Sequence, residues 1–76
     1  MDPLHRAARA KALLQDDVLQ DALRMVKDDL VGVFTYPNSS QEEVLEAHRM
    51  VRSLGALEDK LKSFVDNGAV LERRKK

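Results

Sequence analysis

The chain has 76 residues, 43% of them hydrophobic, and its 13 basic and 13 acidic side chains balance to a formal net charge of zero. A chain this short forms one small domain, and such domains often depend on disulfides, a metal or self-association for part of their stability. The absence of cysteine excludes disulfides and thiolate metal sites, so helix packing and association with other chains remain.

Membrane insertion and secretion are not expected from the apolar pattern. The longest apolar run covers residues 30 to 34, whereas a transmembrane helix needs about 20 predominantly apolar residues. The first 15 residues carry Arg6, Arg9 and Lys11 and lack the apolar stretch of a secretory signal. We therefore expect no membrane association and a cytoplasmic location.

A first helix is predicted over residues 3 to 14. Asp2 is a suitable N-cap and Pro3 suits the first helical position. The apolar positions of residues 17–35, when continued towards the N-terminus at helical spacing, fall on the charged residues Asp16 and Arg9. The apolar faces of the two segments would therefore point to different sides of one continuous helix. We expect a break at residues 15 to 17.

A second helix is predicted over residues 17 to 35. Asp16 or Asp17 caps its start, and Pro37 disfavours helical geometry at Tyr36. Its apolar residues recur at spacings of four and three: Leu19, Leu23, Val26, Leu30 and Val33. The short connection after it is typical of antiparallel helices.

A third helix is predicted over residues 41 to 66. Ser40 and Glu43 fit a capping box at its start, and Gly68 after Asn67 fits a left-handed cap at its end. A seven-residue repeat predicts its inward face: Ala47, Met50, Leu54, Leu57, Leu61 and Phe64. A flanking apolar line of Val44, Val51 and Val65 is interrupted by Glu58.

These elements predict an all-α fold, in which a helical hairpin (17–35 and 41–66) and an N-terminal helix form one domain over residues 1–68. Residues 69–76 are expected to be a basic tail. At 1.5 Å per residue the third helix outruns the second by about 10 Å near Leu61 to Val65. Either the first helix folds back over that stretch, or another subunit covers it. We expect an oligomeric helical bundle.

Two features of this pattern indicate an interface but leave alternatives open. Gly55 lies in a stretch of small residues that also includes Ser53 and Ala56. It is either a tolerated surface glycine, or it allows the first helix or another chain to approach closely. Phe34 and Tyr36 either close the end of the core or anchor a partner. The candidate interface residues are Met50, Leu54, Gly55, Leu57, Leu61, Phe64, Val65, Phe34 and Tyr36.

No arrangement of residues indicates catalysis or a cofactor. His5 and His48 are far apart in sequence, and no nucleophile is aimed at either. The adjacent pairs Asp16–Asp17 and Asp28–Asp29 point about 100° apart on a helix, so neither is a shared acid–base pair. We expect a protein that is not an enzyme and that binds no metal or cofactor.

The basic terminal run supports a second hypothesis. It comprises Arg73, Arg74, Lys75 and Lys76, and it either remains solvated or contacts phosphates as part of a nucleic-acid-binding accessory protein. The acidic middle helix argues against a DNA-recognition helix there.

Residues 7 to 68 resemble small helical proteins encoded among the packaging and structural genes of tailed bacteriophages. The resemblance rests on an Ala/Leu-rich start "ARAKALL", the helix "DDVLQDAL", a proline-containing turn "FTYPNSS" and a long helix that ends in "VDNG". The chain differs in having "FTYP" where a tryptophan often precedes the proline, and in its basic tail. The resemblance implies a non-enzymatic assembly or virion-associated protein that self-associates or docks on a larger phage component.

Overall fold

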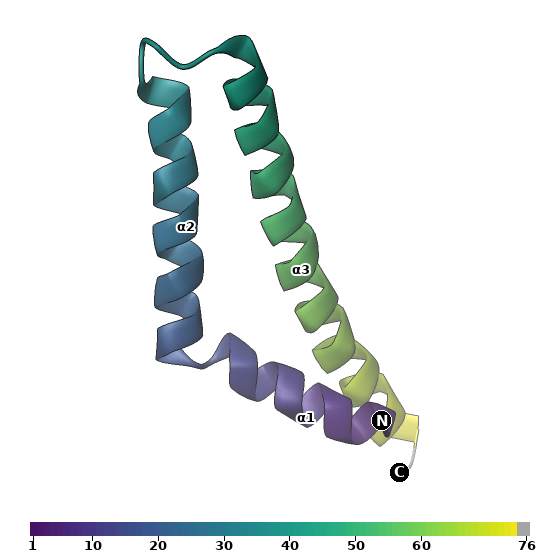
Figure 1. Cartoon of the computed structure of the whole chain (residues 1–76). Coiled ribbons are helices and arrows are strands. Elements are labelled where there is room, and N and C mark those ends of the chain that lie inside the picture. Colours follow the sequence, from purple (N-terminus) through teal and green to yellow (C-terminus); the bar gives the residue numbers. More distant parts are fainter. Residues whose placement is uncertain (75–76) are drawn as a thin grey trace.

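The computed structural model describes residues 1–74, which form three helices and no strand. These are α1 (Pro3–Leu14), α2 (Asp17–Thr35) and α3 (Gln41–Arg74). The predicted all-α architecture is confirmed. In Figure 1, α2 and α3 run antiparallel and diverge from their connection, while α1 crosses the open end and meets the far part of α3.

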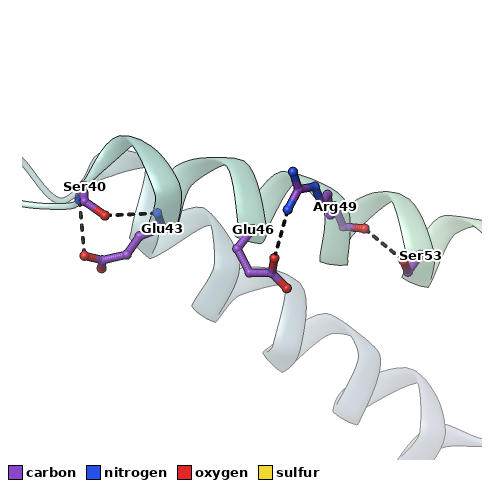
Figure 2. A network of polar contacts seen from close by, with 5 residues as sticks. All are labelled: Ser40, Glu43, Glu46, Arg49 and Ser53. Carbon is purple, nitrogen blue, oxygen red and sulfur yellow. Dashed lines mark hydrogen bonds and ion pairs between the residues drawn. The ribbon is translucent and has the colours of Figure 1, made fainter.

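The helix starts follow from local hydrogen bonds that the sequence predicts. The Asp2 and Asp16 carboxylates accept bonds from the backbone N–H groups of Leu4 (3.2 Å) and Leu19 (2.8 Å). At the start of α3, the Glu43 N–H donates to Ser40 Oγ (3.1 Å) and the Ser40 N–H donates to Glu43 Oε1 (3.3 Å), as Figure 2 shows. The predicted capping box is therefore confirmed.

The end of α3 differs from the prediction. The helix continues through Gly68 to Arg74, and no glycine in the described part of the chain has a positive φ. The predicted left-handed cap at Gly68 is wrong because Gly68 is buried inside the helix against Ala7 of α1. Residues 69 to 74 of the predicted basic tail are helical and belong to α3, and Lys75 and Lys76 lie outside the described residues.

The inward face of α3 also differs from the predicted repeat. Met50 and Leu57 are 45% and 52% exposed, so two of the predicted inward positions face outwards. The buried and half-buried residues include a line that starts at Val44 and keeps spacings of three and four: Val44, Ala47, Val51, Leu54, Glu58, Leu61, Val65 and Gly68. The inward line therefore combines three residues predicted as inward, Ala47, Leu54 and Leu61, with the three valines predicted as flanking.

Glu58 accounts for the interruption in that line. Its carboxylate forms an ion pair with the Lys27 ammonium of α2, and only 19% of its side chain is exposed. An acid at an inward position is tolerated because a cation on the facing helix compensates its charge. The charge pair replaces an apolar contact in the region where α2 and α3 diverge.

The molecule is elongated and has a thin core. It measures 58 × 22 × 18 Å, and its radius of gyration is 16.6 Å, against about 11 Å for a compact chain of this length. Its accessible surface is 6099 Å², against about 4,700 Å² for a compact monomer of this mass. The buried apolar residues of the described chain are few and mostly small: Ala7, Ala10, Leu23, Leu30 and Ala47.

Candidate helix-docking surface

The last third of α3 is covered by α1. The Arg6 guanidinium lies over the Phe64 ring, with 4.2 Å from Cζ to the ring centroid, and Ala7 packs against Gly68. Of the predicted interface residues, Leu61, Phe64 and Val65 are half-buried in this region. The first helix therefore folds back over the stretch of α3 that outruns α2, which was one of the two predicted alternatives.

An open groove lies between α2 and the first half of α3. Its volume is about 670 Å³. Leu30 and Val33 of α2 and Leu45, Ala47 and Met50 of α3 supply its apolar lining. The charged residues along it are Glu42, Glu43, Glu46 and Arg49. The groove thus combines an apolar floor with a rim that has three carboxylates and one guanidinium.

The exposed apolar surface continues beyond the groove on both helices. Leu57 follows Met50 by seven residues and Val26 precedes Val33 by seven, so each pair shares one side of its helix. Val26 is 40% exposed, close to the values for Met50 and Leu57. We call the surface formed by Val26, Leu30, Val33, Ala47, Met50 and Leu57 the docking face.

Polar side chains hold the groove rim in place. Glu46 pairs with Arg49 one turn later at 3.4 Å, and Glu43 is held by the capping box. Ser53 Oγ donates to the Arg49 carbonyl oxygen at 2.9 Å, as Figure 2 also shows. The Glu46 and Arg49 side chains remain 62% and 72% exposed, so they are available to an incoming chain.

The other predicted interface residues lie apart from the groove. Leu54 is half-buried between the helices. Apart from its chain neighbours and the nearby backbone of α3, no heavy atom of residues 1–74 lies within 4 Å of a Cβ built at Gly55. The close crossing with the first helix occurs at Gly68 instead. Phe34 and Tyr36 lie at the hairpin end, where Tyr36 is 60% exposed and its hydroxyl accepts a bond from Asn38 Nδ2 at 3.4 Å.

Charge separates along the long axis of the molecule. The hairpin end carries the groove carboxylates, whereas α1 carries Arg6, Arg9 and Lys11 and packs beside the end of α3, where Arg73 and Arg74 lie. Arg9, Lys11, Arg73 and Arg74 are exposed. The same end also carries the exposed acids Asp2, Asp66 and Glu72. The hairpin end therefore has a mainly acidic groove, whereas α1 and the end of α3 carry more basic than acidic side chains.

Sequence reasoning did not single out Glu42, Glu46, Ala7 or Gly68 as interface residues. Acidic residues are common at the start of a helix because they complement its dipole. The two glutamates therefore gave no indication of an interface. The sequence does contain small residues that permit a close contact between α1 and α3, namely Ala7 and Ala10 on α1 and Gly68 on α3. Their pairing depends on how the chain folds back.

Within residues 1–74 no group of three or more His, Asp or Glu side chains is placed to hold a metal ion. His5 and His48 are exposed on separate helices. None of the helices described contains an apolar stretch long enough to cross a lipid bilayer. Comparison of the chain with protein-family models, with curated proteins and with solved structures finds no match.

Proposed function

We propose that this protein is a non-enzymatic assembly protein that acts by helix–helix association through the docking face. The observation that carries the proposal is the apolar groove that Met50 lines, with Leu57 exposed one heptad further along α3, in a chain whose own core buries few large side chains. Burying apolar surface is the main favourable term in protein association. A partner helix in the groove would supply the packing that α2 and α3 do not give each other.

The exposed area is large enough for such a role. The accessible surface exceeds that of a compact monomer by roughly 1,400 Å², whereas a standard protein–protein interface takes about 800 Å² from each partner. The groove also offers charged groups at its rim, which is the usual arrangement of an apolar interface centre with a polar edge. Association would thus bury surface that this fold leaves open.

The phage-type setting of the proposal comes from the resemblance of residues 7–68 to small helical packaging and structural proteins. In that setting the partner is another copy or a larger structural component, and the chain is part of the virion or of an assembly intermediate. Mass spectrometry of purified virions from the source, with detection of this chain at a fixed copy number, would support a virion-associated role.

The docking face is tested by measuring molar mass by light scattering over a concentration series. We expect the wild-type chain to associate and the Leu57→Glu variant to remain monomeric, because a carboxylate cannot be buried in an apolar contact without a partner. Val31→Glu is a matched control, since Val31 is 51% exposed on α2 and lies outside the docking face. Equal association of both variants would contradict a role for this face.

A nucleic-acid-binding role is the second candidate, and one structural observation favours it. Because α3 extends to Arg74 and α1 packs beside it, Arg73 and Arg74 lie at the same end as the basic residues of α1. If this surface binds phosphates, deleting residues 73–76 should abolish salt-sensitive retardation of DNA. Under the assembly role, the same deletion leaves self-association unchanged.

A further inference from the structure

We propose that the occupant of the docking face is a second copy of this chain, packed antiparallel about a two-fold axis that passes near Leu57. This inference rests on the proposed function and adds the identity and orientation of the partner. It follows from three properties of the molecule: the position of Leu57 along α3, the separation of charge, and the tapered shape.

The position of Leu57 makes an antiparallel pairing self-complementary. Leu57 is near the middle of α3, with Met50 one heptad before it and Phe64 one heptad after it. When two copies of α3 run antiparallel with Leu57 at the axis, Met50 of each copy faces the Phe64 region of the other. The exposed groove of one protomer therefore meets the end of the other that α1 covers.

The charges favour the antiparallel orientation over the parallel one. An antiparallel pair brings Glu42 and Glu46 of each groove towards the α1 surface with Arg9 and Lys11 on the other copy. The two-fold axis forms this contact twice. A parallel pair would instead place like charges together at both ends, which disfavours association.

The shape of the molecule agrees with this orientation. In Figure 1 the helices are close at the α2–α3 connection and spread apart at the end where α1 crosses. Two such tapered molecules fit side by side when one is reversed. Because the two-fold axis makes both copies use the same contact, the assembly closes as a dimer and does not extend into a filament.

Single cysteines test the position of the axis, because the natural chain has none. We expect the Leu57→Cys variant to form a disulfide-linked dimer under mild oxidation, since the axis places the two thiols side by side. Asp59→Cys is the control: Asp59 is exposed on the same helix, about 200° around it from Leu57. Efficient cross-linking of Asp59→Cys together with none of Leu57→Cys would overturn the arrangement.

Charge reversal tests the orientation. The Glu42→Lys/Glu46→Lys chain and the Arg9→Glu/Lys11→Glu chain should each dimerise about tenfold or more weakly than wild type. Mixed together, they should form a heterodimer of near wild-type affinity, because each lysine-bearing groove then meets a glutamate-bearing α1 and the unaltered groove meets the unaltered α1. Circular dichroism confirms that each chain remains helical, and recovery on mixing excludes misfolding as the cause of the loss.

The outcomes separate this inference from the proposed function. A wild-type chain that stays monomeric at every concentration contradicts the two-fold dimer, and the docking face would then serve a different protein. A dimer that Leu57→Glu disrupts, but that neither cross-links through Leu57→Cys nor responds to charge reversal, contradicts the antiparallel arrangement and leaves the docking face supported. A dimer that shows both signatures supports the inference.

Discussion

Ala7 of α1 packs directly on Gly68 of α3, so closely that a Cβ atom at Gly68 would lie 2.3 Å from the Cβ of Ala7. This contact joins the two ends of the chain and needs a residue without a side chain at position 68. It also keeps α3 helical beyond the point where its own sequence favours an end.

We expect opposite effects from adding a methyl group at the two glycines of α3. Gly68→Ala should destabilise the fold by about 1–3 kcal/mol, because the methyl group overlaps Ala7 and forces α1 away. Gly55→Ala should stabilise it by up to about 1 kcal/mol, because the position is helical and no atom of another described helix lies within 4 Å of the added methyl group. Chemical denaturation followed by circular dichroism measures both effects.

The Ala7→Gly/Gly68→Ala chain is the control for this pair. It removes one methyl group and adds another at the same contact, so it should recover much of the stability that Gly68→Ala loses. If Gly68→Ala is as stable as Gly55→Ala, the close approach of α1 to α3 is not the reason for glycine at position 68.

The Lys27–Glu58 pair between α2 and α3 should be replaceable by apolar residues. Glu58→Ala leaves the Lys27 ammonium without its partner, and we expect a loss of up to about 1 kcal/mol, since the Lys27 side chain is 41% exposed. The Lys27→Met/Glu58→Leu chain should equal or exceed the wild type in stability, because it continues the apolar line without desolvating charges. Urea unfolding of the wild type, Glu58→Ala and the double variant measures the three stabilities. A double variant less stable than Glu58→Ala would contradict the expectation that apolar residues can replace the ion pair.

The Arg6 guanidinium stabilises α1 on α3 through the Phe64 ring. Its Nε atom is buried and has no hydrogen-bond partner among residues 1–74, so the ring and the packing of the side-chain stem carry the contact. Arg6→Ala should destabilise the fold by about 1–2 kcal/mol. A double-mutant cycle with Phe64→Leu should give a coupling energy of about 0.5–1 kcal/mol, and a coupling near zero would show that the ring does not interact with the cation.

The capping box at the start of α3 should contribute about 1 kcal/mol. Ser40→Ala removes the acceptor of the Glu43 N–H and should lower the melting temperature by about 4–8 °C in a domain of this size. Ser39→Ala is the neighbouring control, because only the backbone of Ser39 donates a hydrogen bond, to the Tyr36 carbonyl oxygen. Equal effects at the two serines would mean that the box does not define the helix start.

Only part of the candidate surface could be anticipated from the sequence, since two of the six residues of the docking face were predicted as interface residues. Met50 and Leu57 are members of the predicted interface and lie on the docking face, whereas Phe64 and Val65 are partly covered by α1. Helical periodicity identifies which residues share a side of α3. It does not identify which neighbouring helix covers each part of that side, because this depends on where α1 folds back.

The sequence by itself determined where α1 and α2 begin and end and where α3 begins. Asp2, Asp16, Ser40 and Pro37 act through bonds and steric contacts within a few residues of themselves, so a local pattern is enough to predict them. Tertiary structure decided the rest. The ion pair with Lys27 allows the acidic Glu58 to face the other helices. The contact with Ala7 keeps α3 helical through Gly68, beyond its predicted end. Both contacts join residues on different helices, and their free energy outweighs the local preference of a glutamate for solvent and of a glycine for a helix end.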